Sequence, residues 1–194
     1  MRTPASPLLL AAVERAVEQH GLAFLTVDQI AQEAGLSRVT LYRRGLTREG
    51  LLTQAVLAAA DEFKVAALPA LTHPGSGAER LERLLVALFD LADAHLALLS
   101  GLFDGPSAVF HLDVPGHDPE VLTRFEYTEP FERVLADGVA DGTLQSTNPN
   151  EDAELLFNVA GWSYVHLRRS HKWTARRARA AVNRIALRGL AAPT

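Results

Sequence analysis

The side chains best suited to chemistry with a partner are gathered between Thr26 and Arg48. They are hydroxyl groups, guanidinium groups and one small apolar side chain: Thr26, Ser37, Arg38, Val39, Thr40, Tyr42, Arg43, Arg44 and Arg48. Arginine can donate two hydrogen bonds to one guanine, the methyl groups of valine and threonine can contact a thymine methyl, and tyrosine can reach a phosphate. This combination is suited to reading a DNA duplex. A single arginine near a helix end would indicate less, because the helix dipole alone favours it there.

Two short helices joined by a glycine turn would position these side chains. Thr26 is followed three residues later by Gln29, which is the pattern of a capping box, and Gly35 can end the helix in a left-handed conformation. Ser37 can cap a second helix, in which Leu41 points inward while the arginines remain exposed. One face of the first helix is apolar at helical spacing: Val27, Ile30, Ala31 and Ala34. The spacing predicts a helix-turn-helix, whose second helix enters the major groove of DNA.

The stretch from Thr26 to Leu52 resembles the TetR family of bacterial transcriptional regulators. The similar parts are Ile30-Ala31, Ala34-Gly35-Leu36-Ser37, Thr40-Leu41-Tyr42 and Thr47-Arg48-Glu49 followed by Leu51. The resemblance implies that Thr26 and Arg48 bind phosphates at helix N-termini. It also implies that one face of the second helix meets the DNA: Arg38, Val39, Thr40, Tyr42 and Arg43. A three-helix N-terminal domain, a homodimer and release of DNA by a small apolar ligand follow from the same resemblance.

Two glycines depart from the family pattern. Gly45 stands where the family usually has an aromatic residue, and Gly50 lies in the first turn of the next helix. A glycine inside a helix costs about 0.5–1 kcal/mol relative to alanine. We therefore expect a loosened junction after the second helix unless Leu46 fills the gap.

Composition agrees with a compact regulator. The chain has 194 residues, of which 48% are apolar, and its net charge is −4. Arginines nevertheless cluster in the motif, and the local field decides phosphate binding because distant charges are screened. The sequence has no cysteine, which excludes disulfides, thiolate metal sites and a cysteine nucleophile. We see no transmembrane run and no secretory signal, and expect a cytoplasmic protein without a membrane partner.

The periodicity predicts an all-α fold with two domains. We expect a helix-turn-helix DNA-binding domain at 1–60 and a larger helical domain for ligand binding and dimerisation at 61–194. The expected helices cover residues 7–20, 27–34, 38–44, 48–67, 77–99, 119–141, 149–170 and 174–191. Ser6, Ser76, Asp118 and Asn148 are the caps that mark four of the starts.

The last two predicted helices are candidates for a dimer interface. The helix over 149–170 has apolar residues on all sides from Leu155 to Leu167, and the final helix has one apolar stripe. We predict that these helices pair with a second copy through Leu156, Ala160, Leu167, Ala178, Val182 and Ile185. An ordinary monomeric core is the alternative.

A ligand pocket in the larger domain is predicted mainly from the resemblance. Aromatic side chains with a few histidines could line an apolar cavity: Phe89, His95, Phe103, Phe110, His111, Tyr127, Phe131, Trp162 and His166. For each aromatic residue, packing in the core is an alternative.

Two other classes of function remain open at this point. His111, Asp113, His117 and Asp118 are ligand types for zinc and could serve a metal-dependent enzyme. The arginines could instead bind an acidic protein. We favour a sequence-specific transcriptional regulator without a cofactor or enzymatic activity, acting as a repressor on a palindromic operator.

Overall fold

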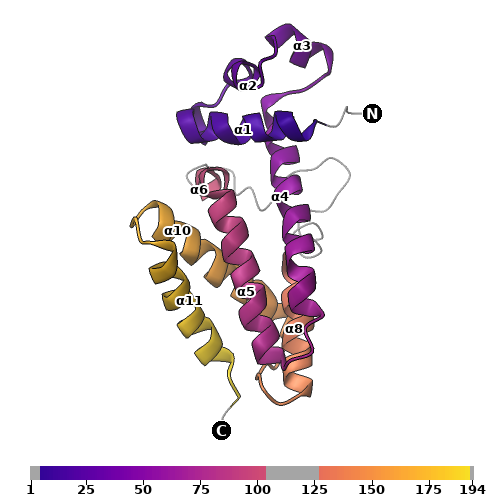
Figure 1. Cartoon of the computed structure of the whole chain (residues 1–194), viewed down its shortest axis with the longest axis vertical. Coiled ribbons are helices and arrows are strands. Elements are labelled where there is room, and N and C mark those ends of the chain that lie inside the picture. The colour runs from indigo at the N-terminus through magenta and orange to yellow at the C-terminus, as the bar shows by residue number, and fades with distance from the viewer. Residues whose placement is uncertain (1–4, 104–126, 193–194) are drawn as a thin grey trace. The chain divides into compact units, whose positions relative to one another are not determined.

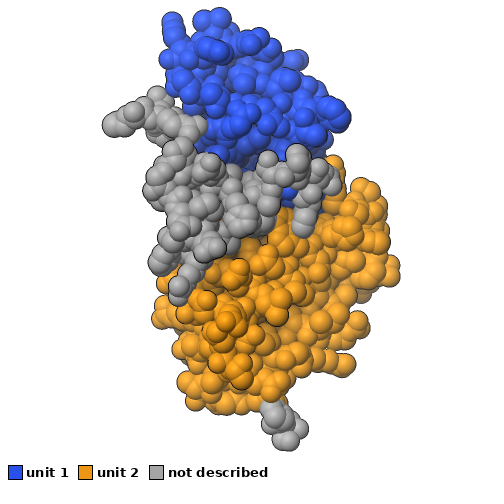
Figure 2. Space-filling model, turned by 180° about the vertical axis from the view of Figure 1, so that it is seen from behind, with its two compact units in different colours: residues 1–59, 95–116 blue, residues 60–94, 117–194 orange. Residues whose placement is uncertain are grey.

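The structure is a computed structural model that describes residues 5–103 and 127–192. The chain forms two compact units, one from residues 1–59 and 95–116 and one from residues 60–94 and 117–194 (Figure 2). All four residues considered above as metal ligands lie outside the described residues: His111, Asp113, His117 and Asp118. Phe110 lies outside them as well.

Unit 1 contains the N-terminal helices and one later helix (Figure 1). Its elements are α1 (Pro7–His20), the 3-10 turn η1 (Leu22–Phe24), α2 (Val27–Glu33), α3 (Arg38–Arg43), the start of α4 (Arg48–Leu71) and α6 (Leu96–Phe103). Ser6 begins α1 by accepting a hydrogen bond from the backbone N–H of Leu9. The core of this unit consists of apolar side chains shielded from water: Leu9, Val13, Val17, Ile30, Leu41, Leu51 and Leu98.

Unit 2 contains the rest of the described helices. It includes α4 from Ala60 onward, α5 (Gly77–Ala94), α8 (Glu129–Ala140), α9 (Pro149–Phe157), the π-helical turn η4 (Asn158–Trp162), α10 (Ser163–Arg169) and α11 (Ala175–Leu190). The predicted all-α fold is confirmed, because the described residues form helices and one isolated β-bridge between Leu144 and Ala191. The predicted caps are confirmed at Ser76 and Asn148, whose side chains accept hydrogen bonds from the backbone of Glu79 and Glu151.

Aromatic stacking fills much of the core of unit 2. Phe63 stacks on Phe131 with ring centroids 6.1 Å apart, and Tyr127 stacks on Phe157 at 5.3 Å. At the start of α5, Gly77 packs against the backbone of Gly138 on α8 so closely that a Cβ on Gly77 would lie 2.2 Å from the Cα of Gly138. The packing of α5 on α8 therefore requires glycine at Gly77.

A polar network centred on Asp93 joins α5 to α10 and α11. Its carboxylate accepts hydrogen bonds from the hydroxyl of Tyr164, from Nε of Arg168 and from Nη2 of Arg179, each at 2.7 Å. Burial works against the charge, but these three donors hold the pKa of Asp93 below its usual value. Burial and the neighbouring carboxylate raise the pKa of Tyr164, so that the hydroxyl remains a donor.

The prediction of one helix over 77–99 is wrong, because the helix is interrupted at His95. Residues 95–103 pack within unit 1, although the predicted boundary placed them in the larger domain. Leu98 and Leu102 are buried there, and α6 packs on α1. The imidazole Nδ1 of His95 lies 2.9 Å from a carboxylate oxygen of Glu14. These contacts with α1 come from distant sequence, so helical periodicity could not indicate the break.

Among the described residues, no single helix is long and apolar enough to cross a membrane. Across a sharp bend, α5 and residues 96–102 taken together have that length and composition.

Candidate nucleic-acid interface

The two helices of the predicted motif are fixed by short-range hydrogen bonds. The Oγ1 of Thr26 accepts a hydrogen bond from the backbone N–H of Gln29 at 3.3 Å, and the side chain of Gln29 accepts one from the backbone N–H of Thr26 at 2.8 Å. Gly35 has φ +64°, a left-handed conformation that glycine adopts without strain. Ser37 caps α3 by accepting a hydrogen bond from the backbone N–H of Thr40 at 3.1 Å. The capping box and the second cap are thus confirmed.

One face of α3 is anchored and the other is free. Leu41 is fully buried, whereas Val39 is 69% exposed and Tyr42 is 74% exposed. Arg43 and Arg44 are also exposed. Helix α3 thus presents basic and small apolar side chains together, as major-groove recognition requires.

The hydroxyl groups of Ser37 and Thr40 bond to one another. Their oxygens lie 2.8 Å apart, and Thr40 is half-buried. A contact between the methyl group of Thr40 and a base stays a prediction.

Arg48 has a structural partner that the sequence did not indicate. Its Nε donates to the carbonyl oxygen of Leu25 at 2.8 Å, and its Nη2 donates to that of Leu22 at 2.6 Å. These bonds tie the start of α4 to η1. The acceptors are backbone carbonyls, which every residue has, so the sequence could not indicate these partners. A phosphate contact by Arg48 stays a prediction.

The junction after α3 is well formed despite its glycines. Gly45 has φ +67°, so a glycine suits that position. Leu46 is buried, and Thr47 caps α4 by accepting a hydrogen bond from the backbone N–H of Gly50 at 3.1 Å. Leu46 therefore fills the gap beside Gly45, as expected.

The N-terminal residues match a known family. Residues 9–55 fit the family described as "Bacterial regulatory proteins, tetR family". The match assigns residues 9–55 to the N-terminal domain of that family. The match supports a DNA-binding regulator with a helix-turn-helix, as the sequence predicted. No curated protein matches the chain.

Solved structures of TetR-like proteins share the fold over nearly the whole chain. A transcriptional regulator of the TetR/AcrR family from Thermobifida fusca is 23% identical, with a TM-score of 0.68 over 93% of this chain and 95% of that one. The fatty acid degradation regulator FadR of Bacillus halodurans is 16% identical, with a TM-score of 0.75 over 95% and 97%. The ketosteroid transcriptional regulator of Mycobacterium tuberculosis is 18% identical, with a TM-score of 0.72 over 100% of both chains.

The predicted ligand-binding residues lie in several separate places. Phe89 stacks on Tyr164 with ring centroids 4.5 Å apart, and Phe131 and Tyr127 belong to the aromatic core. His95 lies in unit 1, His166 is exposed against His171, and Trp162 is half-buried. The side chain of Phe103 lies outside the described part. No single described pocket collects these residues.

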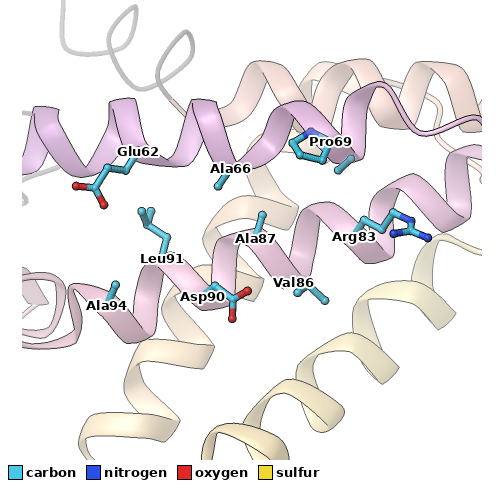
Figure 3. Close-up of a pocket in the computed structure, with 10 residues that line it drawn as sticks. Glu62, Ala66, Pro69, Arg83, Val86, Ala87, Asp90, Leu91 and Ala94 are labelled. Atoms are coloured by element: carbon cyan, nitrogen blue, oxygen red, sulfur yellow. The ribbon is translucent and has the colours of Figure 1, made fainter.

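A groove lies instead between α4 and α5 of unit 2 (Figure 3). Its volume is about 530 Å³, and the side chains of Ala66, Ala87 and Leu91 face it together with Glu62 and Arg83. None of the predicted ligand-binding residues lines it. Small side chains give little hydropathy contrast, so sequence periodicity could not single out this groove.

The predicted dimer residues divide into two groups. Leu156, Ala160, Ala178 and Val182 are buried within unit 2, so they leave little surface for a partner. Leu167 is half-buried, and Ile185 is 66% exposed. The exposed apolar residues nearby in sequence are Leu155 and Val159. The four residues are buried because the apolar stripe of each helix packs on the core of unit 2. The apolar side chains that stay exposed therefore lie on a neighbouring side of each helix.

Within the described part of the chain, no group of three or more histidine, cysteine, aspartate or glutamate side chains could hold a metal ion. The metal ligands considered above lie outside it.

Proposed function

We propose that this regulator is a homodimeric repressor that reads a palindromic operator with α3 and is released by a small apolar ligand. The observation that carries the proposal is the exposed face of α3, where Val39, Tyr42 and Arg43 project from a helix fixed at both ends. Two such helices related by two-fold symmetry would read two half-sites of a duplex.

Selection of duplexes from a random pool tests the reading of DNA. We expect the wild type to enrich a palindrome, and Arg43→Ala to bind it more weakly by about 1–3 kcal/mol with relaxed base choice at one position. Arg15→Ala is the matched control, because Arg15 is an exposed arginine of unit 1 that pairs with Glu33 and lies outside α3. Folded protein that enriches no duplex would contradict the proposal.

The dimer is supported by the free surfaces of α9 and α11. Leu155 and Ile185 are 61% and 66% exposed, so each helix offers a large apolar side chain to a partner. The same helices differ in charge, since Glu151 and Glu154 are exposed on α9 and Arg184 and Arg188 on α11. In a two-fold arrangement, α9 of one copy could meet α11 of the other with opposite charges.

Analytical ultracentrifugation tests the dimer. We expect Ile185→Lys to shift the protein toward monomer, because a charge would enter an apolar contact. Val65→Lys is the control, as Val65 is similarly exposed but lies on α4. An unchanged sedimentation profile for Ile185→Lys would contradict the proposed surface.

An apolar effector is supported by the groove between α4 and α5, and by the fatty acid and ketosteroid regulators that share the fold. Lauric acid and a ketosteroid are the probes. We expect one of them to raise the melting temperature and to release the selected duplex, with both effects reduced in Ala87→Trp, which fills the groove. Neither probe altering stability or DNA binding would contradict an effector of this class.

A further inference from the structure

An ion pair links the two helices of the DNA-binding motif. The Nη1 of Arg38, the first residue of α3, donates to Oδ2 of Asp28 on α2 at 3.2 Å. The side chains are 64% and 59% exposed, respectively. Such an exposed pair contributes little to folding, about 0.2–1 kcal/mol. Its position at the start of α3 suggests a role in binding instead.

The ion pair occupies only one edge of the guanidinium. Arginine has five N–H donors in a rigid plane. Nη1 bonds to Asp28, and within residues 5–103 and 127–192 no hydrogen bond from Nε or Nη2 of Arg38 is seen. These two nitrogens form the other edge of the fork, which can donate to O6 and N7 of guanine. Asp28 can therefore hold Arg38 while leaving that edge available to a base.

The carboxylate also alters how Arg38 responds to phosphate. A free arginine gains affinity for any duplex by neutralising a phosphate and releasing its counterion. Asp28 already neutralises Arg38 and adds a negative charge that phosphates repel. We expect this arrangement to weaken sequence-independent binding more than hydrogen bonding to a guanine.

We propose that Asp28 is a specificity-determining positioning residue, which acts through Arg38 to favour base recognition over sequence-independent phosphate binding. This inference rests on the proposed reading of DNA by α3. It adds that selectivity depends on a residue of the preceding helix.

The test compares Asp28→Asn with the wild type on two duplexes, the one enriched from a random pool and one of scrambled sequence. We expect affinity for the scrambled duplex to rise by about 1.5- to 5-fold, the fold-change equivalent of the energy of an exposed ion pair. The dependence of that affinity on salt should steepen by about 0.9 in log–log slope, because one more phosphate is neutralised. The ratio of enriched to scrambled affinity should fall.

Two matched variants separate this role from general electrostatics. Glu33→Gln removes the same charge from α2, where Glu33 pairs with Arg15 at 3.3 Å, and should leave the ratio unchanged. In an Arg38→Ala background, Asp28→Asn should no longer change the ratio. Circular dichroism confirms folding of each variant.

The outcomes distinguish the two proposals. An enriched duplex whose affinity ratio is unchanged or increased in Asp28→Asn would overturn the role of Asp28 and leave the proposed function standing. An equal effect of Glu33→Gln, or an effect that persists without Arg38, would also overturn it. A wild type that enriches no duplex would overturn both.

Discussion

The DNA-binding motif and unit 2 are held together over very different distances in sequence. In the motif, the capping hydrogen bonds of Thr26 and Ser37 join residues three positions apart. In unit 2, the bonds from Arg80 to Asp137 and from Arg179 to Asp93 join residues 57 and 86 positions apart. Local interactions thus shape the motif, and tertiary contacts shape the other unit.

The difference predicts that the two regions respond differently to substitution. A motif fixed by caps and glycine turns loses about 1 kcal/mol when one such residue changes. A unit whose helices meet at close contacts can lose more from a single added methyl group. Both tryptophans, Trp162 and Trp173, lie in unit 2, so their fluorescence reports on that unit while circular dichroism reports on the whole chain.

The largest effect is expected from Gly77→Ala. The added Cβ would meet the backbone of Gly138, which cannot move aside as a side chain can, so we expect a loss of about 3 kcal/mol in the free energy of unfolding. Urea unfolding followed by tryptophan fluorescence measures it. Gly161→Ala is the control, because its Cβ would meet only Leu88 at an ordinary 3.8 Å. Equal stability of the two variants would show that α5 and α8 do not depend on this close approach.

Asp93→Asn should have the next largest effect, about 2 kcal/mol, because Arg168 and Arg179 would lose their shared anion. Since the pKa of Asp93 is lowered in the folded state, its stabilisation is complete above the unfolded value of about 4 and is lost as the pH falls below it. Urea unfolding at several pH values measures this. The midpoints of the variant and the wild type should differ at neutral pH and converge in acid. A constant difference at all pH values would refute the role of the charge.

A smaller loss, about 1 kcal/mol, is expected for Gly35→Ala in the motif. A Cβ at Gly35 would have no heavy atom within 4 Å, so the cost lies in the left-handed backbone alone. Thermal unfolding followed by circular dichroism should show the loss, while the tryptophan transition of unit 2 should move less. A full and equal shift of both signals would indicate that the units unfold together.

The smallest effect is expected from Gly189→Ala near the end of α11, and its sign is opposite. This glycine lies in a helix with open space around the missing Cβ, so alanine should stabilise the protein by about 0.5 kcal/mol. The tryptophan-monitored urea midpoint should rise slightly. A fall would mean that the position needs glycine for contacts outside this chain, such as a partner's helix.

Much of the motif could be predicted from sequence because its determinants are adjacent residues. The pair of Thr26 and Gln29 forms a capping box, and Gly35 ends the first helix, as their types and spacing indicated. The partners of Arg48 and Asp28 could not be predicted. Arg48 bonds to backbone carbonyls more than twenty residues away, and Arg38 reaches Asp28 only because the turn folds α3 back onto α2.

In unit 2 the sequence determined that the segments are helical, through their periodicity, caps and prolines. It did not determine which side of each helix faces the core. Leu155 and Leu156 are adjacent and equally apolar, yet the first is exposed and the second buried. Nor did it determine the break at His95, where contacts with α1 end one helix and begin another. A residue's type and spacing fix local backbone preference, whereas burial depends on which distant surfaces meet, and only the tertiary structure decides that.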